Sequence, residues 1–201
     1  MSNGGAGTDT LSFLSSESDG SEITPSTGGA VNFENLIATN SAETIRGDSG
    51  NNEIKGKAGA DTVYGGAGDD NLVESETGAN DNLYGEAGND TLAASAGDNI
   101  LDGGTGANTI TTGGGSDTIV LRVGDGGSTL AAADTITDFT DGTDFLGMDD
   151  NLLFSELTIA QGTGSNSNDT IISKGSEYLA ILTGIDASVL SEADFTPVDI
   201  A

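Results

Sequence analysis

The sequence predicts an all-β fold, a repetitive coil of short strands followed by a small C-terminal β cap. Three observations predict it. A nine-residue period runs through the middle of the chain, the 201 residues include 32 glycines but only two prolines, and apolar residues are scarce. Dense glycine without proline indicates many tight turns, and a fixed short period is typical of a coil that stacks on itself.

The composition limits both the core and the function. Hydrophobic residues make up 34% of the chain and aromatic residues 4%, while 33 acidic against 5 basic residues give a net charge of −28. Such a chain repels itself toward disorder unless cations compensate its charge. The absence of His and Cys excludes Cys/His zinc sites, disulfides and Cys or His nucleophiles. Five scattered basic residues cannot neutralise a phosphate backbone, so we expect no nucleic-acid partner.

The first ten residues, MSNGGAGTDT, lack the basic and apolar regions of a cleaved signal peptide. No run of apolar residues approaches the length of a membrane span, so we expect none.

The repeat occupies residues 38–120, which divide into nonapeptides except for one eleven-residue copy, ESETGANDNLY. Position eight is aliphatic in every copy, and position six is always acidic or the corresponding amide. The position-six residues are Glu43, Asn52, Asp61, Asp70, Asp81, Asp90, Asn99, Asn108 and Asp117. An isolated copy, GGAGTDTLS at 4–12, places Asp9 and Leu11 at the matching positions.

Each repeat combines a turn with a short strand. Glycines at positions one, two and four allow turns with positive φ and inward carbonyl oxygens. The last three residues extend, and because side chains alternate along a strand only the aliphatic residue points inward.

The pattern G-G-x-G-x-D-x-U-x resembles the RTX, or hemolysin-type, calcium-binding nonapeptide repeat, over about 92 residues. The resemblance implies a right-handed parallel β-roll, a calcium-binding β-solenoid in which two nonapeptides form one coil and turns 18 residues apart stack. The competing interpretation is a metal-free glycine-rich coil.

Applying this step, lengthened by two at the eleven-residue copy, predicts two columns of position-six residues. One column holds Glu43, Asp61, Asp81, Asn99 and Asp117, and the other holds Asn52, Asp70, Asp90 and Asn108. Like charges about 4.8 Å apart repel strongly, and Ca²⁺ fits between them because it accepts six to eight oxygen ligands in flexible geometry. We therefore expect these nine residues and Asp9 to bind Ca²⁺, with up to about seven ions in the roll.

Two finer expectations concern individual residues of the turns. Sites at the Asn99 and Asn108 levels should be weaker than those formed by aspartates alone. Asp69, next to Asp70, is expected to face solvent or to contribute its carbonyl oxygen.

The chain divides into three parts: an N-terminal segment, 1–37, with the isolated repeat; the roll, 38–120; and 121–201, a β cap with an uncleaved secretion signal. Strand-like alternation marks LTIAQ, DTIIS and EYLAILTGI in the cap, and DASVLSEADF should form a short helix or a turn starting at Asp186 or Ser191. Asp138, Asp141 and Asp144 surround Gly142 and form either one further calcium site or, as we favour, a polar turn.

The resemblance implies a bacterial protein that leaves the cell through the type I secretion machinery and resides outside the cell or on its surface. We expect a non-enzymatic, calcium-folded structural protein whose strand edges let copies join head-to-tail into a filament or surface layer. In that assembly the isolated repeat would lie on a neighbour's last coil. The alternative is a secretion and folding module of a larger type I-secreted enzyme or toxin. An enzyme acting on polysaccharide is disfavoured, because calcium accounts for every acidic cluster.

Overall fold

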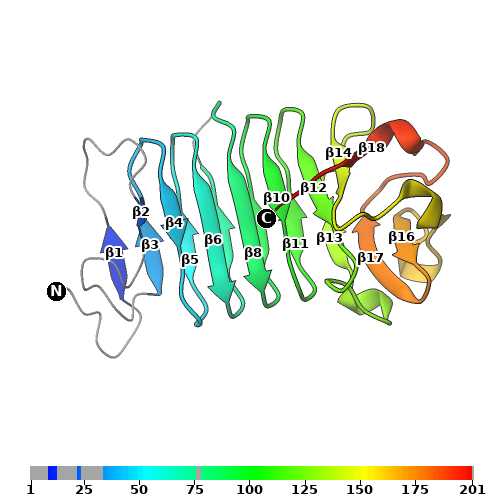
Figure 1. Cartoon of the computed structure of the whole chain (residues 1–201), viewed down its shortest axis with the longest axis horizontal. Coiled ribbons are helices and arrows are strands. Elements are labelled where there is room, and N and C mark those ends of the chain that lie inside the picture. Colours follow the sequence, from blue (N-terminus) through cyan, green and yellow to red (C-terminus); the bar gives the residue numbers. More distant parts are fainter. Residues whose placement is uncertain (1–8, 13–21, 24–33, 76–77, 201) are drawn as a thin grey trace.

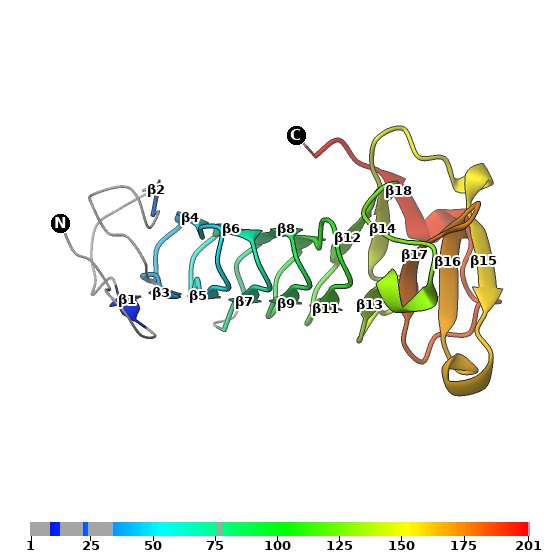
Figure 2. The ribbon, with the colours of Figure 1, turned by 90° about the horizontal axis from the view of Figure 1, so that it is seen from below.

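The chain forms an elongated coil of two facing sheets, seen edge-on in Figure 2 and face-on in Figure 1. This computed structural model describes residues 9–12, 22–23, 34–75 and 78–200. Within them, odd-numbered strands and β16 form a ten-stranded sheet, and the remaining strands form an eight-stranded sheet. The chain alternates between the two sheets, so each coil supplies one strand to each. The predicted parallel β-roll is confirmed.

The strands are short and mostly parallel to their neighbours. Those of the ten-stranded sheet are β1 (Thr10–Ser12), β3 (Asn35–Ile37), β5 (Glu53–Lys55), β7 (Asn71–Val73), β9 (Thr91–Ala93), β11 (Thr109–Thr111), β13 (Asp134–Ile136), β17 (Glu177–Leu182), β16 (Thr170–Lys174) and β15 (Thr158–Gln161). Those of the eight-stranded sheet are β2 (Glu22–Ile23), β4 (Thr44–Arg46), β6 (Thr62–Ala67), β8 (Asn82–Ala87), β10 (Ile100–Asp102), β12 (Thr118–Leu121), β14 (Phe145–Met148) and β18 (Phe195–Pro197). Short 3-10 turns lie at Leu130–Ala132, Phe154–Glu156, Gly164–Asn166 and Glu192–Asp194.

The register follows the predicted step. Ile54 pairs with Leu72, 18 positions on, and Leu72 pairs with Leu92, 20 positions on across the lengthened copy. Because both sheets take up the same extra length, the insertion leaves every aliphatic side chain facing inward.

The core of the roll is one side chain thick. Each three-residue strand shows a half-buried, buried, half-buried pattern or close to it, and the buried residue is the aliphatic of position eight. These residues are essentially without solvent exposure: Ile45, Ile54, Val63, Leu72, Leu83, Leu92, Leu101, Ile110 and Ile119. Two facing rows of single aliphatic residues provide far less apolar burial than a conventional domain core.

The coil continues after the nine-residue period ends at Val120. β13 and β17 extend one sheet in parallel and β14 and β18 extend the other, before β16 and β15 add antiparallel strands. The strands predicted from LTIAQ, DTIIS and EYLAILTGI are confirmed. Ser191 caps the 3-10 turn at Glu192–Asp194 by accepting a hydrogen bond from the backbone N–H of Ala193 (3.3 Å).

At the N-terminal end, the strand of the isolated repeat lies on its own chain. β1 pairs in parallel with β3, with Leu11 opposite Leu36. This intramolecular pairing lengthens the roll, and the placement of the isolated repeat on a neighbouring copy stays a prediction. Residues 4–8 of this repeat lie outside the described residues.

Candidate metal centre

The turns of the roll bury two continuous rows of position-six side chains. In each row the side-chain Oδ1 accepts a hydrogen bond from the backbone N–H of the equivalent residue one coil earlier. We call the first row the Asp61 ladder; its donor-to-acceptor pairs are Glu43 to Asp61 (2.7 Å), Asp61 to Asp81 (2.9 Å), Asp81 to Asn99 (2.9 Å) and Asn99 to Asp117 (2.8 Å). The second is the Asp70 ladder, with Asn52 to Asp70 (2.7 Å), Asp70 to Asp90 (2.8 Å) and Asp90 to Asn108 (2.8 Å).

These ladders bring together the same residues as the two columns predicted from the sequence. All nine are at most 4% exposed. Their role as ligands stays a prediction, because the geometry fixes their position and not the ion.

Both ladders extend beyond the repeat. Asp117 donates its backbone N–H to Asp144 Oδ1 (3.1 Å), and Asn108 donates to Asp134 Oδ1 (2.9 Å). At the N-terminal end the backbone N–H of Asp9 donates to Glu34 Oε2 (2.7 Å), so Asp9 lies one coil before Glu34.

Sequence reasoning missed Asp134 and Glu34. Asp134 does not fall on the nine-residue period, whereas Glu34 does, nine residues before Glu43, but its segment GAVNFENLI lacks glycine at positions two and four. The available signal was an acidic residue directly before a short strand, as in DTI and ENLI.

The second carboxylate oxygen of most ladder acids has no partner. The oxygens that are buried and make no hydrogen bond include Asp9 Oδ2, Glu43 Oε2, Asp61 Oδ2, Asp70 Oδ2, Asp90 Oδ2 and Asp117 Oδ2. A buried carboxylate oxygen without a donor is costly, and a bound cation removes that cost. The ladders therefore fit a bound metal ion, because their buried oxygens lack any other partner.

Burial disturbs the titration of the ladder acids. It raises the pKa of Asp61 and Asp70 to about 7 and that of Asp90 and Asp117 to about 6, although a backbone N–H bonded to each carboxylate opposes the shift. Neighbouring carboxylates add to the rise, as Glu43 and Asp81 do for Asp61. Either a proton or a metal ion must therefore neutralise these groups near neutral pH.

Backbone carbonyl oxygens converge on the same places. At Gly65 a Cβ atom would lie 2.5 Å from Asp70 Oδ2 and 2.8 Å from the carbonyl oxygen of Gly85. Only glycine leaves this space open between a carboxylate and the next coil's carbonyl. Hard oxygen donors of both kinds suit Ca²⁺, which tolerates irregular geometry, better than Mg²⁺.

Carbonyl ligands are needed for such a site. Among the residues that the structure describes, no three His, Cys, Asp or Glu side chains are arranged to hold a metal ion by themselves. A site here would pair carboxylates from adjacent turns with main-chain oxygens.

The amide levels differ from the aspartate levels. Asn108 Nδ2 donates to Asp134 Oδ1 (2.9 Å) and to the carbonyl of Gly104 (3.2 Å), and Asn99 Nδ2 donates to Asp117 Oδ1 (2.8 Å) in the same way. An amide N–H thus satisfies an oxygen that a cation would otherwise neutralise. This supports the prediction of weaker binding at these levels, which stays a prediction.

The remaining acidic residues considered from the sequence lie apart from the ladders or at their end. Asp69 is exposed, and its Oδ1 accepts hydrogen bonds from the backbone N–H and side-chain amide of Asn89 (2.9 and 3.1 Å). Around Gly142, Asp144 is buried in the Asp61 ladder, Asp138 accepts from the backbone of Thr112, and Asp141 is exposed. The three carboxylates therefore do not converge on one point, which agrees with a polar turn and not with a calcium site.

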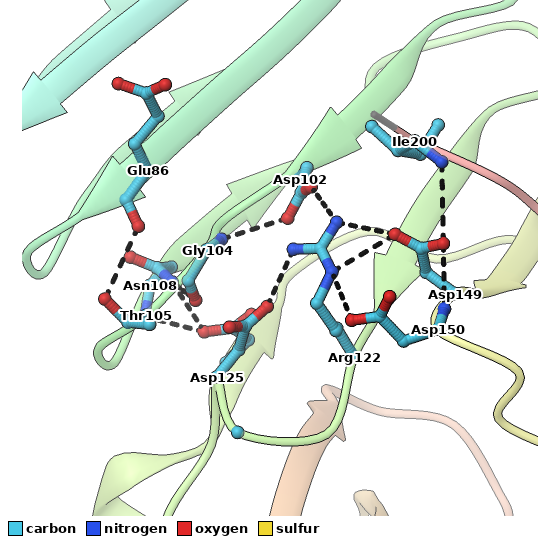
Figure 3. Close-up of polar contacts among 12 residues, drawn as sticks. Glu86, Asp102, Gly104, Thr105, Asn108, Arg122, Asp125, Asp149, Asp150 and Ile200 are labelled. Carbon is cyan, nitrogen blue, oxygen red and sulfur yellow. Dashed lines mark hydrogen bonds and ion pairs between the residues drawn. The ribbon is translucent and has the colours of Figure 1, made fainter.

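A second charged cluster surrounds Arg122, which the sequence analysis did not single out (Figure 3). Its guanidinium forms ion pairs with Asp149 (2.7 Å), Asp102 (3.0 Å) and Asp125 (3.0 Å). Burial disfavours the charged guanidinium, yet its hydrogen bonds to Asp149 and the charge of Asp102 raise the pKa of Arg122 above its ordinary value. Here an arginine supplies part of the compensating positive charge, which the ladders of the roll lack.

A parallel coil whose turns bury rows of carboxylate and carbonyl oxygens defines a class of protein, the repetitive cation-binding solenoid. Within that class, residues 37–72, 77–110 and 94–127 match the four-copy model of the RTX calcium-binding nonapeptide repeat. The repeat region of the chain therefore consists of RTX calcium-binding nonapeptide repeats and folds as a parallel β-roll.

Solved structures similar to this chain include an extracellular lipase and two subunits of an epimerase. The extracellular lipase LipA from Serratia marcescens is 14% identical, with a TM-score of 0.43, over 87% of this chain and 42% of the lipase. Two subunits of the Azotobacter vinelandii mannuronan C5-epimerase are each 21% identical: AlgE6R3, with a TM-score of 0.37, over 87% of this chain and 82% of the subunit, and AlgE6R2, with a TM-score of 0.44, over 75% and 90%. The chain thus spans less than half of the lipase.

The comparison with curated proteins found no match. None of the described residues forms a helix long and apolar enough to cross a membrane.

Proposed function

We propose that this chain is a secreted, extracellular folding unit that is largely unfolded where calcium is scarce and folds where calcium is abundant. The observation that carries the proposal is the double row of buried carboxylate oxygens without hydrogen-bond partners. Proteins of the RTX family are typically exported from bacteria by type I secretion, which takes the chain from a calcium-poor to a calcium-rich compartment.

The energetics support a switch. A site with a dissociation constant near 10⁻⁴ M contributes about 1.4 kcal/mol when calcium is about ten times that concentration. Several such sites together reach the stability of an ordinary domain, about 5–15 kcal/mol. We expect fewer ions than the seven gaps between stacked turns, because the amides of Asn99 and Asn108 already satisfy oxygens at their levels.

We propose a non-catalytic role for the chain. The buried acids of the roll are held in ladders that bond to backbone N–H groups, and the acids around Arg122 are held by ion pairs with it. A folding module within a larger secreted enzyme or toxin and a stand-alone structural protein both fit this role.

Assembly into a filament or surface layer is a second candidate, and the strand edges favour it. β1 and β2 are the terminal described strands of their sheets, and each pairs on one side only. At the other end the ten-stranded sheet ends in the antiparallel strands β16 and β15, so a further parallel coil would match the N-terminal edges better.

Calcium titration followed by circular dichroism, with light scattering on the same samples, tests these proposals. We expect β-sheet signal to appear cooperatively between micromolar and millimolar calcium and to be lost with EGTA. The double variant D70N/D90N should need more calcium, while D69N, which changes an exposed carboxylate one position away, should titrate like the wild type. A chelated sample with unchanged spectrum and melting temperature would overturn the folding role, and monomers at all calcium concentrations would overturn assembly.

A further inference from the structure

Position one of the turns differs between the two ladders. Beside the Asp70 ladder it is always glycine, at Gly47, Gly65, Gly85 and Gly103. Beside the Asp61 ladder the described position-one residues are Ala38, Gly56, Glu74, Ala94 and Thr112. A glutamate therefore stands where the repeat calls for glycine, in the lengthened copy ESETGANDNLY.

The Glu74 side chain points into the roll and not into solvent. Glu74 follows β7, and its backbone N–H donates to the carbonyl of Ala93 (2.8 Å), while the carbonyl of Val73 accepts from Gly56 (3.3 Å). Glu74 thus lies between Gly56 and Ala94 in the stack of turns. Its carboxylate oxygens occupy the space that a Cβ atom at Gly56 would need.

This carboxylate is buried without any compensation from the protein. Glu74 is 4% exposed, and neither Oε1 nor Oε2 has a hydrogen-bond partner. The charges nearest to it are those of Asp61, Asp81 and Glu43, all of the same sign. Asp61 Oδ2, in the same coil as Gly56, is likewise buried and unpartnered.

We propose that Glu74 and Asp61 bind one calcium ion together with main-chain oxygens, so that Glu74 is a side-chain ligand outside the position-six set. The inference rests on the proposed calcium-dependent folding. A protonated glutamic acid filling the gap would donate its O–H to an acceptor such as Asp61 Oδ2, and the structure contains no such bond. One cation would compensate all three unpaired oxygens, whereas one proton would compensate a single oxygen.

The added charge has a measurable consequence. A site with two carboxylates and no amide should be among the tightest of the Asp61 ladder, since calcium affinity increases with ligand charge. Glu74 would also add a ligand to a ladder in which Ala94 and Thr112 carry a Cβ atom where the other ladder has glycine.

The test compares wild type, E74Q and E86Q by native mass spectrometry at saturating calcium and by calorimetric titration. Glu86 is exposed and stands at position two of the next turn, so E86Q removes the same charge without touching a ladder. We expect E74Q to bind one ion fewer or to bind one ion about tenfold more weakly, and E86Q to match the wild type. Circular dichroism at saturating calcium checks that each variant folds.

Several outcomes overturn the proposal. E74Q with the wild-type ion count and affinities would show that Glu74 is not a ligand. E74G with an additional ion would show that Glu74 blocks a site. Should E74Q fail to fold, E74D carries the test: one weakened ion in a folded protein supports the proposal, and unchanged affinities overturn it. A wild type that binds no calcium would instead refute the proposed function itself.

Discussion

The roll and the C-terminal region share the same two sheets but are stabilised differently. In the roll, residues 34–120, each strand buries one aliphatic side chain and the turns bury carboxylates that lack partners. In the C-terminal region, 121–200, a wider apolar cluster packs around Phe195, whose ring lies 4.9 Å from that of Phe154. The ring pair of the roll, Tyr64 and Tyr84, is only half-buried. The difference shows that a continuous sheet does not require a continuous source of stability.

Charge compensation follows the same division. Arg122, directly after the last strand of the repeat, pairs with carboxylates from β10 and from the end of β14. In the roll, no described ladder carboxylate has an ion pair of this kind, and we propose that calcium supplies the positive charge there. The C-terminal region should therefore tolerate chelation better than the roll.

The largest effect is expected from removing calcium. EGTA should release the amides of β4 to β12 to rapid hydrogen exchange, while β16 and β17, held by antiparallel pairing and apolar packing, keep part of their protection. Hydrogen exchange read by mass spectrometry measures this, with Mg²⁺ addition as a control that should not restore the roll. Equal loss of protection in both regions would remove the distinction between them.

Replacing Arg122 should destabilise the C-terminal side of the junction whether or not calcium is present. R122A leaves Asp149 and Asp102 buried without a counter-charge, which should cost about 3 kcal/mol. Thermal melts in calcium and in EGTA measure the loss. The control K174A breaks an exposed pair with Glu156 and should cost less than about 1 kcal/mol. An R122A defect that calcium fully corrects would contradict this assignment.

Adding a methyl group inside a ladder should lower the stability of the calcium-bound protein much more than that of the calcium-free protein. In G85A the new Cβ would lie 2.5 Å from the carbonyl oxygen of Gly103 and close to Asp90 Oδ2. We expect a loss of about 2 kcal/mol in calcium and a much smaller loss in EGTA, measured by denaturant titration. G114A is the matched control, because a Cβ there meets no atom within 4 Å. Equal losses in both variants would show that the turn, and not the ion site, is affected.

A smaller effect is expected from pH, with opposite signs in the two calcium states. Burial raises the pKa of Asp61 and Asp70 to about 7 in the folded protein, against an ordinary value of 3.8. The folded state then binds protons more tightly than the unfolded state, so this stabilisation is complete below about pH 4 and is lost as pH rises through 7. Calcium-free protein should gain β-sheet signal from pH 8 to pH 5, whereas calcium affinity should fall over the same range. A calcium-free spectrum independent of pH would contradict it.

The roll was predictable because its information is local and repeated. A single nonapeptide specifies its own turn, its own inward aliphatic residue and its own ladder residue, so Asp70 or Leu72 could be assigned without knowing the rest of the chain. The step of 18 residues then fixed which turns stack.

The parts that could not be predicted depend on pairings between distant segments. Asp134 joins the Asp70 ladder across 26 residues, and Arg122 pairs with Asp149 across 27 residues. Neither separation equals the 18-residue step between stacked turns. Glu74 was overlooked for the opposite reason. Its position in the repeat was known, but a glutamate in place of glycine indicates only a departure from the motif, and its burial is visible only in the structure.

The turns are tied to each other in both directions, and this has a mechanical consequence. Asp70 donates its backbone N–H forward to Asp90, while Asn89 donates backward to Asp69. Each coil contacts only its immediate neighbours. Tension applied to the two termini would therefore act on every coil and detach the coils one at a time. Each rupture would lengthen the molecule by roughly 60 Å, the extended span of about 18 residues, giving a sawtooth whose tooth count reports how many coils an ion-loaded roll contains.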